Sequence, residues 1–312
     1  MSRSYLVTGG AGFIGSHLVE ALTARGDAVN VLDDLSTGSR GNLALGAGRI
    51  ELVHGSVADP ASVARAIRGV DGVFHLAALP SVARSVEAPL DTHAANATGT
   101  VHILDAARRA KVKVVYAGSS SAYGDNDAPA KSEDMRENPL SPYAVSKLTG
   151  ELYCRCFANV YGLPVFVTRF FNVYGPRQVP NSPYSGVIAA FCHALLHGTR
   201  PRIDGDGKQS RDFTYVGDVA RGLLLAMDAD LTGCEVVNLA GGASYSLLEM
   251  LDALQRHAGT NLTPVFAPAR VGDVKHSRAD VSRARELLDF SVRVPFAEGL
   301  AQTFEWYRSQ QK

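Results

Sequence analysis

The 312-residue sequence predicts an α/β fold in which a doubly wound parallel sheet is followed by a smaller C-terminal α+β lobe. Short apolar runs alternate with amphipathic segments from the start of the sequence to about residue 172, and this alternation is typical of βαβ units. The apolar runs contain few polar residues, which favours strands that helices cover on both faces.

The expected elements follow one another in a regular order. Strands are predicted at residues 4–9, 28–33, 49–55, 70–78, 112–120 and 164–172. Helices are predicted between them at residues 15–26, 60–69, 98–111 and 141–162.

The pattern changes after residue 172, where Pro, Gly and polar residues become frequent and helical and strand-like pieces alternate irregularly. We therefore expect a Rossmann-type region at residues 1–174 and a smaller lobe at residues 175–312. The apolar run 233–241 is expected either to belong to that lobe or to return to the first sheet.

The charge balance and the cysteines exclude several classes of function. Lys+Arg and Asp+Glu both number 31, so no basic field favours nucleic acid or an anionic membrane as a partner. No run of 18 apolar residues occurs. The four cysteines (Cys154, Cys156, Cys192 and Cys234) have no C-x-x-C pairing and no metal-ligand spacing. We therefore expect no metal site, and reduced thiols in a cytosolic protein.

A glycine-rich loop, "VTGGAGFIG", directly follows the first predicted strand. Gly9 permits a tight turn, Gly12 lets the backbone approach a pyrophosphate, and Gly15 allows close helix–strand packing. The next strand ends at Asp33, 18 residues after Gly15. A carboxylate there can accept a hydrogen bond from the adenosine ribose and would repel a 2′-phosphate. The pattern predicts NAD rather than NADP, with Phe13 and Ile14 at the start of the pyrophosphate-binding helix.

The fourth predicted strand ends in "HLAA", residues 75–78. The side chains of Leu76, Ala77 and Ala78 are expected to leave room for the cofactor, whereas His75 is expected to be a packed residue at the strand end. Asn96, at the start of the next helix, is expected either to serve the nicotinamide side of the cofactor or to cap that helix.

A helix is predicted to begin at Ser141-Pro142 and to end at Gly162. It carries Tyr143 and Lys147 four residues apart on one face. A free tyrosine has a pKa of about 10, so action as a base near neutral pH requires a fall of roughly 2–3 pKa units, or about 3–4 kcal/mol. An adjacent ammonium and a nicotinamide cation can supply that stabilisation. The alternative is an ordinary i,i+4 pair on a helix surface.

Five features together resemble the extended short-chain dehydrogenases/reductases, and within them the UDP-galactose/UDP-N-acetylglucosamine 4-epimerases. They are "TGGAGFIGSH", the acid at residue 33, "HLAA", "SSSAYGD" and "SPYAVSK", and the resemblance extends over nearly the whole chain. It implies that Tyr143 is the base and that Lys147 lowers its pKa and holds the nicotinamide ribose. Ser119, four residues before Tyr123, would complete this set, and Ser120 and Ser121 are expected to contact the sugar.

The residues after Ser119 bear on the reaction. The related 4,6-dehydratases resemble Thr-Asp-Glu here and the related decarboxylases usually carry a Glu nearby, whereas this chain has Ser119-Ser120-Ser121-Ala122. The resemblance therefore implies oxidation and re-reduction at one carbon, C4. A one-way reductase or a dehydratase on the same fold remains the alternative.

The resemblance also implies a set of contacts with the UDP-sugar. Asn172 would contact the diphosphate or the sugar, Arg211 and Arg270 the diphosphate, and Asp273 a ribose hydroxyl. For each of them a surface salt bridge is the alternative.

Ser277 is expected to admit a large C2 substituent, because a bulky residue at that position would leave room only for a hydroxyl. This favours UDP-GlcNAc/UDP-GalNAc, with UDP-Glc/UDP-Gal as further substrates and UDP-glucuronate left open. Asp212 and Phe213 are expected to hold their loop.

Two further expectations concern the adenine and the assembly. Similar proteins often show Gly-Asp-Ile/Val after the third strand, but this chain reads Gly55-Ser56-Val57. Ser56, beside Val57, would therefore contact the adenine more weakly than an aspartate. Apolar positions on more than one face of 92–110 and 143–161 favour a helix-pair homodimer, although helices buried within one chain would look similar.

Overall fold

The computed structural model describes residues 2–44, 49–125, 128–179, 186–269 and 275–311. The strands are β1 (Ser4–Thr8), β2 (Ala28–Asp33), β3 (Ile50–His54), β4 (Gly72–His75), β5 (Lys113–Ser119), β6 (Val165–Phe170), β7 (Val173–Tyr174), β8 (Arg202–Asp204), β9 (Ser210–Asp212), β10 (Thr214–Tyr215), β11 (Cys234–Leu239), β12 (Ser244–Ser246), β13 (Val265–Ala267) and β14 (His276–Ser277). The α-helices are α1 (Phe13–Ala24), α2 (Pro60–Ala66), α3 (Val82–Glu87), α4 (Pro89–His93), α5 (Gly99–Ala110), α6 (Pro142–Tyr161), α7 (Val187–Leu196), α8 (Val216–Asp228), α9 (Leu247–Ala258), α10 (Ser282–Leu288) and α11 (Phe296–Ser309).

Seven parallel strands form the central sheet in the order β11-β6-β5-β4-β1-β2-β3. The chain builds outward from β1 to β3 and then returns to the other side of β1 with β4. The strand order therefore reverses between β1 and β4, and the carboxyl ends of those two strands border the crevice in which doubly wound sheets bind ligands. The predicted α/β fold is confirmed.

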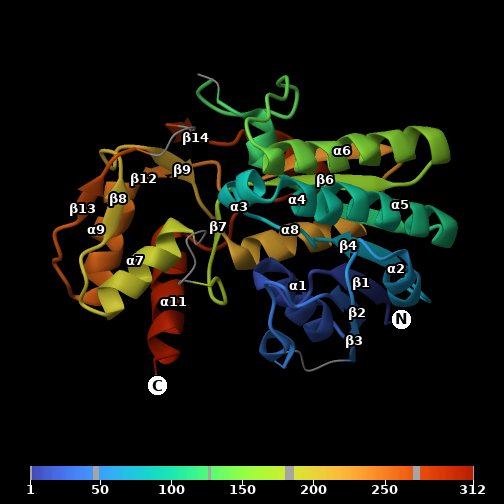
Figure 1. Ribbon diagram of the computed structural model, residues 1–312, viewed down its shortest axis with the longest axis horizontal. Coiled ribbons are helices and arrows are strands. Elements are labelled where there is room, and N and C mark those ends of the chain that lie inside the picture. The colour runs from blue at the N-terminus through green and yellow to red at the C-terminus, as the bar shows by residue number, and fades with distance from the viewer. Residues whose placement is uncertain (1, 45–48, 126–127, 180–185, 270–274, 312) are drawn as a thin grey trace.

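Helices cover both faces of the sheet, which is why its strands are apolar throughout. α2, α5 and α6 pack on one face, where Ile103 and Leu104 meet Val114 and Val165. α1 and α8 pack on the other face, where Leu18 and Leu223 belong to a second buried core. In Figure 1 α5 and α6 lie side by side, and the packing of α1 on α8 brings those two helices together as well. Within the described part of the chain, no helix combines the length and the apolar character needed to cross a membrane.

The apolar run near residue 236 returns to the first sheet. β11 is the edge strand beside β6, with Val236 opposite Val167, and α8, which precedes it, packs on α1. Residues 216–239 therefore pack with the N-terminal region, although they follow residue 174. The division at residues 174/175 stays a proposal about which segments serve the cofactor and which serve the sugar.

The smaller lobe lies to one side of the sheet, on the left in Figure 1. Its core is formed by α7, α9 and α11, with Phe191, Met250, Leu251 and Phe304 buried together. Short strands of two further sheets, β12-β9-β14 and β13-β8, complete it.

Asp212, expected to hold its own loop, ties β9 to the segment after β11 and to Ala279. Its fully buried carboxylate accepts hydrogen bonds from the backbone N–H groups of Gly241 (2.8 Å), Gly242 (2.9 Å) and Ala279 (3.1 Å). Burial raises the pKa of Asp212 to about 6 and the three N–H groups oppose this rise, so the group is ionised at neutral pH. The neighbouring Phe213 is buried as well.

We predict that Asp212→Asn lowers the free energy of unfolding by about 2–3 kcal/mol, because the amide NH₂ would face N–H donors and leave one of them unpaired. Urea denaturation followed by circular dichroism measures the change. Asp206→Asn is the matched control: its exposed carboxylate makes one local bond to the backbone of Lys208, and its loss should cost less than about 0.5 kcal/mol. Equal stability of the two variants would contradict the role of Asp212.

Candidate active site

The glycine loop joins β1 to α1 under tight steric limits. Gly9 has φ +69°, and a Cβ on Gly15 would lie 2.1 Å from the carbonyl oxygen of Gly9. Neither position tolerates a side chain without movement of the backbone. Gly12 is the N-cap of α1 and provides no side chain, and the first turn, with Phe13 and Ile14, carries no acidic residue. The free N–H groups of this helix start are therefore available to an anion such as a pyrophosphate.

Asp33 ends β2 beside this loop. Its carboxylate accepts hydrogen bonds from the backbone N–H of Ala11 (2.9 Å) and of Leu35 (2.8 Å). Burial raises the pKa of Asp33 and these two bonds oppose the rise. The acid therefore lies at the edge of the glycine loop, where the sequence predicted it, and it also fixes the loop.

The end of β4 touches the glycine loop directly. The hydroxyl of Thr8 accepts the N–H groups of Leu76 and Ala77, both at 3.1 Å, and a Cβ on Gly9 would lie 2.9 Å from the Cα of Ala77. Ala78 follows at the same edge. The bonds to Thr8, a residue missed in the sequence reasoning, bring the predicted "HLAA" edge and the glycine loop together.

His75 is a packed residue, as expected. Its ring nitrogens lie 2.7 Å from the hydroxyl of Thr8 and 2.9 Å from that of Thr100. Burial, together with the nearby charge of Lys147, lowers the pKa of His75 to about 3. The imidazole is neutral at physiological pH.

Asn96 does not cap a helix, so that alternative was wrong. It lies in a π-helical segment, Ala94–Thr98, that continues α4 into α5. Its buried side chain accepts the N–H of Leu79 (2.8 Å) and donates to the hydroxyl of Ser146 (3.0 Å) on α6. Asn96 thus connects the loop after β4 to the helix that carries the Tyr–Lys pair. A contact of Asn96 with the cofactor stays a proposal.

The loop after β3 holds Ser56 and Val57. The hydroxyl of Ser56 accepts the N–H of Ala58 at 3.2 Å. Val57 is buried under α5, and its carbonyl oxygen lies 3.1 Å from a ring nitrogen of His102. Ser56 is partly engaged by its own loop, so its contact with adenine also stays a proposal.

The turn after β5 brings Ser119 to Tyr143. The Ser119 hydroxyl accepts the N–H of Ser121 (3.2 Å) and lies 2.7 Å from the Ser121 hydroxyl, while Ser120 begins the following 3₁₀ turn. Burial raises the pKa of Tyr143, and the nearby Ser119 side chain opposes the rise. Two residues 24 apart in the sequence are therefore brought close together.

Lys147 lies one turn after Tyr143 on α6. The helix begins at the predicted cap, where the Ser141 hydroxyl accepts the N–H of Ala144 at 3.1 Å, and it ends at Gly162. The Lys147 side chain is buried, and its Nζ lies 4.5 Å from the centre of the Tyr116 ring. Burial lowers the pKa of Lys147 to about 8.

The expected sugar-side residues are only partly described. Asn172, with φ +26°, donates from its side chain to the carbonyl oxygen of Asp212 at 3.0 Å. Arg211 on β9 lies opposite Ser277 on β14 in the strand register. Arg270 and Asp273 lie outside the described residues.

Gly38 is a further residue that the sequence reasoning missed. A Cβ on Gly38 would lie 2.8 Å from the carbonyl carbon of Ala11 in the glycine loop. The sequence does contain a signal for this position, because "DLSTG" places a glycine five residues after Asp33.

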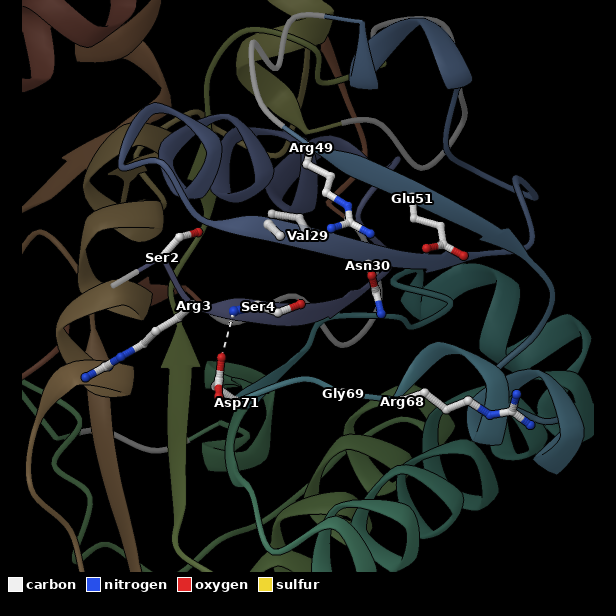
Figure 2. Close-up of a pocket in the computed structure, with 11 residues that line it drawn as sticks. Ser2, Arg3, Ser4, Val29, Asn30, Arg49, Glu51, Arg68, Gly69 and Asp71 are labelled. Atoms are coloured by element: carbon white, nitrogen blue, oxygen red, sulfur yellow. Dashed lines mark hydrogen bonds between the residues drawn. The ribbon is translucent and has the colours of Figure 1, made fainter.

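A separate cavity of about 470 Å³ lies at the opposite edge of the sheet, around the amino ends of β1 and β2. Figure 2 shows the Asp71 carboxylate beside the backbone of Ser4, whose N–H it accepts at 2.8 Å, with Arg49 and Arg68 nearby. None of the predicted site residues lines this cavity, so it is distinct from the candidate active site.

Comparison with known proteins places the chain in a family. Residues 5–240 match the NAD dependent epimerase/dehydratase family. The chain is 42% identical over 311 residues to the UDP-glucose 4-epimerase of Mycolicibacterium smegmatis, with 98% of each chain covered. The protein therefore belongs to this family of extended short-chain dehydrogenases/reductases, which is NAD-dependent and acts on nucleotide sugars.

Two solved structures are similar over almost their full length. The UDP-glucose 4-epimerase of Thermotoga maritima, determined with UDP-glucose, has a TM-score of 0.94 and 37% identity, covering 99% of this chain and 100% of that one. The UDP-N-acetylglucosamine 4-epimerase of Methanobrevibacter ruminantium M1, determined with UDP-N-acetylmuramic acid, has a TM-score of 0.94 and 37% identity, covering 99% of both.

We predict that Gly15→Ala weakens NAD binding by roughly 5–150-fold, because an overpacking cost of about 1–3 kcal/mol at the loop corresponds to that loss. Titration calorimetry with NAD on nucleotide-free protein measures the affinity. Gly41→Ala is the control, since its Cβ would meet nothing closer than the Ser39 hydroxyl at 3.5 Å. Unchanged affinity in a folded Gly15→Ala protein would contradict the assignment of this loop.

Proposed function

We propose that the protein is an NAD-dependent UDP-sugar 4-epimerase that interconverts UDP-GlcNAc and UDP-GalNAc, and also UDP-Glc and UDP-Gal, through a 4-keto intermediate. The main support is the group formed by Ser119, Tyr143 and Lys147, in which a phenol close to a serine side chain lies one helical turn from a buried lysine. This group lies at the carboxyl edge of the sheet, where the family binds its cofactor.

In this proposal Tyr143, as the phenolate, takes the proton of the sugar 4-OH directly or through Ser119. NAD held at the glycine loop and Asp33 would supply a positively charged hydride acceptor for C4, and in its reduced form a hydride donor for the other face of the rotated 4-keto sugar. Tyr143 then returns the proton to the new 4-OH, so that enzyme and cofactor end in their starting states.

The protonation state of Tyr143 sets a requirement on its surroundings. In the protein alone, burial raises the pKa of Tyr143, whereas a base near neutral pH needs a pKa below the ordinary value of about 10. The ammonium of Lys147 and the positive cofactor ring are the charges that favour the phenolate. The proposal therefore requires Lys147 to remain charged and close to Tyr143.

The available carboxylates argue against dehydration. The Ser119–Ala122 turn contains none, and three nearby acids are engaged elsewhere. Glu133 accepts the backbone N–H of Asn238 at 2.6 Å, and Glu137 and Glu151 bind the guanidinium of Arg169. A dehydratase needs a free acid in addition to a base, which favours epimerisation.

The choice of sugar is supported by Ser277, a small residue beside Arg211 in the strand register. One similar structure was determined with UDP-glucose and another with UDP-N-acetylmuramic acid. Both ligands are consistent with the two substrate pairs proposed. UDP-glucuronate is the alternative substrate, and a panel of UDP-sugars with separation of the products distinguishes them.

A homodimer is proposed on the basis of exposed apolar side chains on α3, α4 and α6. They are Val82, Val86, Leu90, Val145, Leu152 and Val160. A second copy covering this surface would bury them. Of the two helices expected from the sequence to form the dimer, 143–161 contributes to this surface, whereas 92–110 carries none of these exposed side chains.

We predict that Tyr143→Phe lowers turnover by about 10²–10⁴-fold while UDP-sugar binding survives, because only the proton acceptor is removed. Turnover is measured by product separation and binding by calorimetry. Tyr153→Phe, an exposed tyrosine on the same helix, is the control. Near-normal turnover of Tyr143→Phe would rule out this role.

We predict that Ser277→Tyr reduces kcat/KM for UDP-GlcNAc more than for UDP-Glc, because the larger side chain takes the space of the acetamido group. The ratio of the two values in one variant is its own control against general damage. Equal loss on both substrates would count against the gating role of Ser277.

A further inference from the structure

Lys147 and Glu151 lie four residues apart on α6, and both are almost fully buried, with 4% and 1% of their surface exposed. Opposite charges at this spacing normally pair on a helix, and a buried pair has added reason to do so because unpaired buried charges are costly. The described residues nevertheless contain no carboxylate in an ion pair with Lys147.

Glu151 is bound by two arginines instead. Arg169, fully buried on β6, donates from Nε to one carboxylate oxygen (2.9 Å) and from a terminal nitrogen to the other (2.7 Å). Arg155 on α6 adds a contact at 2.5 Å, and the same nitrogen of Arg169 reaches Glu137 at 2.8 Å. Two arginines and two glutamates thus form a neutral cluster, with the two-pronged Arg169 contact as its buried part.

The groups around Lys147 add no negative charge. The Tyr116 ring from β5 lies under the ammonium, and burial raises the pKa of that phenol well above its ordinary value. His75 from β4 is neutral, because its pKa is lowered to about 3. Cys154 on α6 stays a thiol, since burial raises its pKa. The Lys147 charge acts to lower the pKa of His75 and of Cys154, and neither group supplies a negative charge to the ammonium.

Glu151 lies near enough to Lys147 to affect the ammonium if the arginines released it. Its charge contributes to raising the pKa of Tyr116, the same phenol whose ring lies under Lys147 and whose hydroxyl donates to the Lys147 carbonyl oxygen at 3.0 Å. A freed Glu151 would stabilise the ammonium but cancel its field at Tyr143.

We propose that Arg169 is a positioning residue that holds Glu151 in a separate ion pair and so keeps the ammonium of Lys147 available to Tyr143. This inference rests on the proposed function, in which the charge of Lys147 favours the Tyr143 phenolate. Arg169 acts through Glu151: its hydrogen bonds within the described residues go to Glu151 and Glu137, and its guanidinium lies over the Tyr123 ring.

The first test needs no turnover. The protein is labelled with ¹³C at the lysine ε-carbon, and the Lys147 signal, assigned with Lys147→Met, is titrated by NMR without cofactor. In Arg169→Met the pKa of Lys147 should rise by about one unit, because Glu151 can then reach the ammonium. In the double variant Glu151→Leu/Arg169→Met it should return to the wild-type value, since the released carboxylate is gone.

Two controls separate this role from a contribution to folding. Arg155→Gln leaves the buried Arg169 contact in place and should not change the Lys147 titration. Glu151→Gln should not change it either, because the wild-type Glu151 charge is already neutralised by the arginines. An unchanged Lys147 pKa in folded Arg169→Met, or a fall in Glu151→Gln, would overturn the proposal. If Arg169→Met does not fold, Glu151→Gln still tests the proposal, because a fall in the Lys147 pKa in that variant would show that Glu151 already acts on the ammonium.

The second test follows the pH profile of kcat/KM with a UDP-sugar. Arg169→Met should shift the acidic limb of the profile about one unit toward higher pH, and so lower kcat/KM about tenfold at a pH below that limb. The reason is that a Lys147 ammonium paired with Glu151 no longer lowers the pKa of Tyr143. The double variant should restore the profile, which a purely structural role would not predict. If the wild type converts no UDP-sugar, the proposed function fails, whereas the NMR titration still tests Arg169.

Discussion

The close approach of three backbone segments at the switch point of the sheet is the constraint on which the site depends. The start of α1 lies against Gly9, Gly9 lies against Ala77 at the end of β4, and no side chain fits between them. Thr8 and Asp33 fix the same contact with hydrogen bonds to backbone N–H groups. The helix start is thereby held open toward an anion, and the ends of β1, β2 and β4 meet at one edge.

The proposed catalytic group comes from the next two elements on that side of the sheet. β5 delivers Ser119 to the edge, and α6 begins there with Tyr143 and Lys147. Asn96 joins α6 to the loop after β4 through Ser146, so the proposed cofactor side and the helix with the Tyr–Lys pair form one continuous hydrogen-bonded unit. The Asp212 carboxylate performs a comparable task for the smaller lobe, where it ties β9 to the segments at Gly241 and Ala279.

Burial determines the charges within this unit. Low polarity around Lys147 lowers its pKa to about 8, and the same surroundings raise the pKa of Tyr143, so burial disfavours the charged form of each group and moves the two pKa values apart. A free carboxylate in such a site would cancel the field of the ammonium at the phenol. The arginine cluster at Glu151 and the backbone contacts of Glu133 show how acids in this region are bound elsewhere.

The sequence by itself determined the order of strands and helices, the glycine loop with its acid at Asp33, and the helix from Ser141 to Gly162, because these follow from local periodicity, capping and turn chemistry. It did not reveal the roles of Thr8 and Arg169, which depend on neighbours far away in the chain. It also suggested a helix cap for Asn96, because the short helix that precedes it has no strong local signal. Only the tertiary structure decided that residues 234–239 return to the first sheet and that Glu151 pairs with β6 rather than with Lys147. Both outcomes depend on long-range packing, in which an apolar strand needs a free sheet edge and a buried carboxylate takes the strongest donor within its reach.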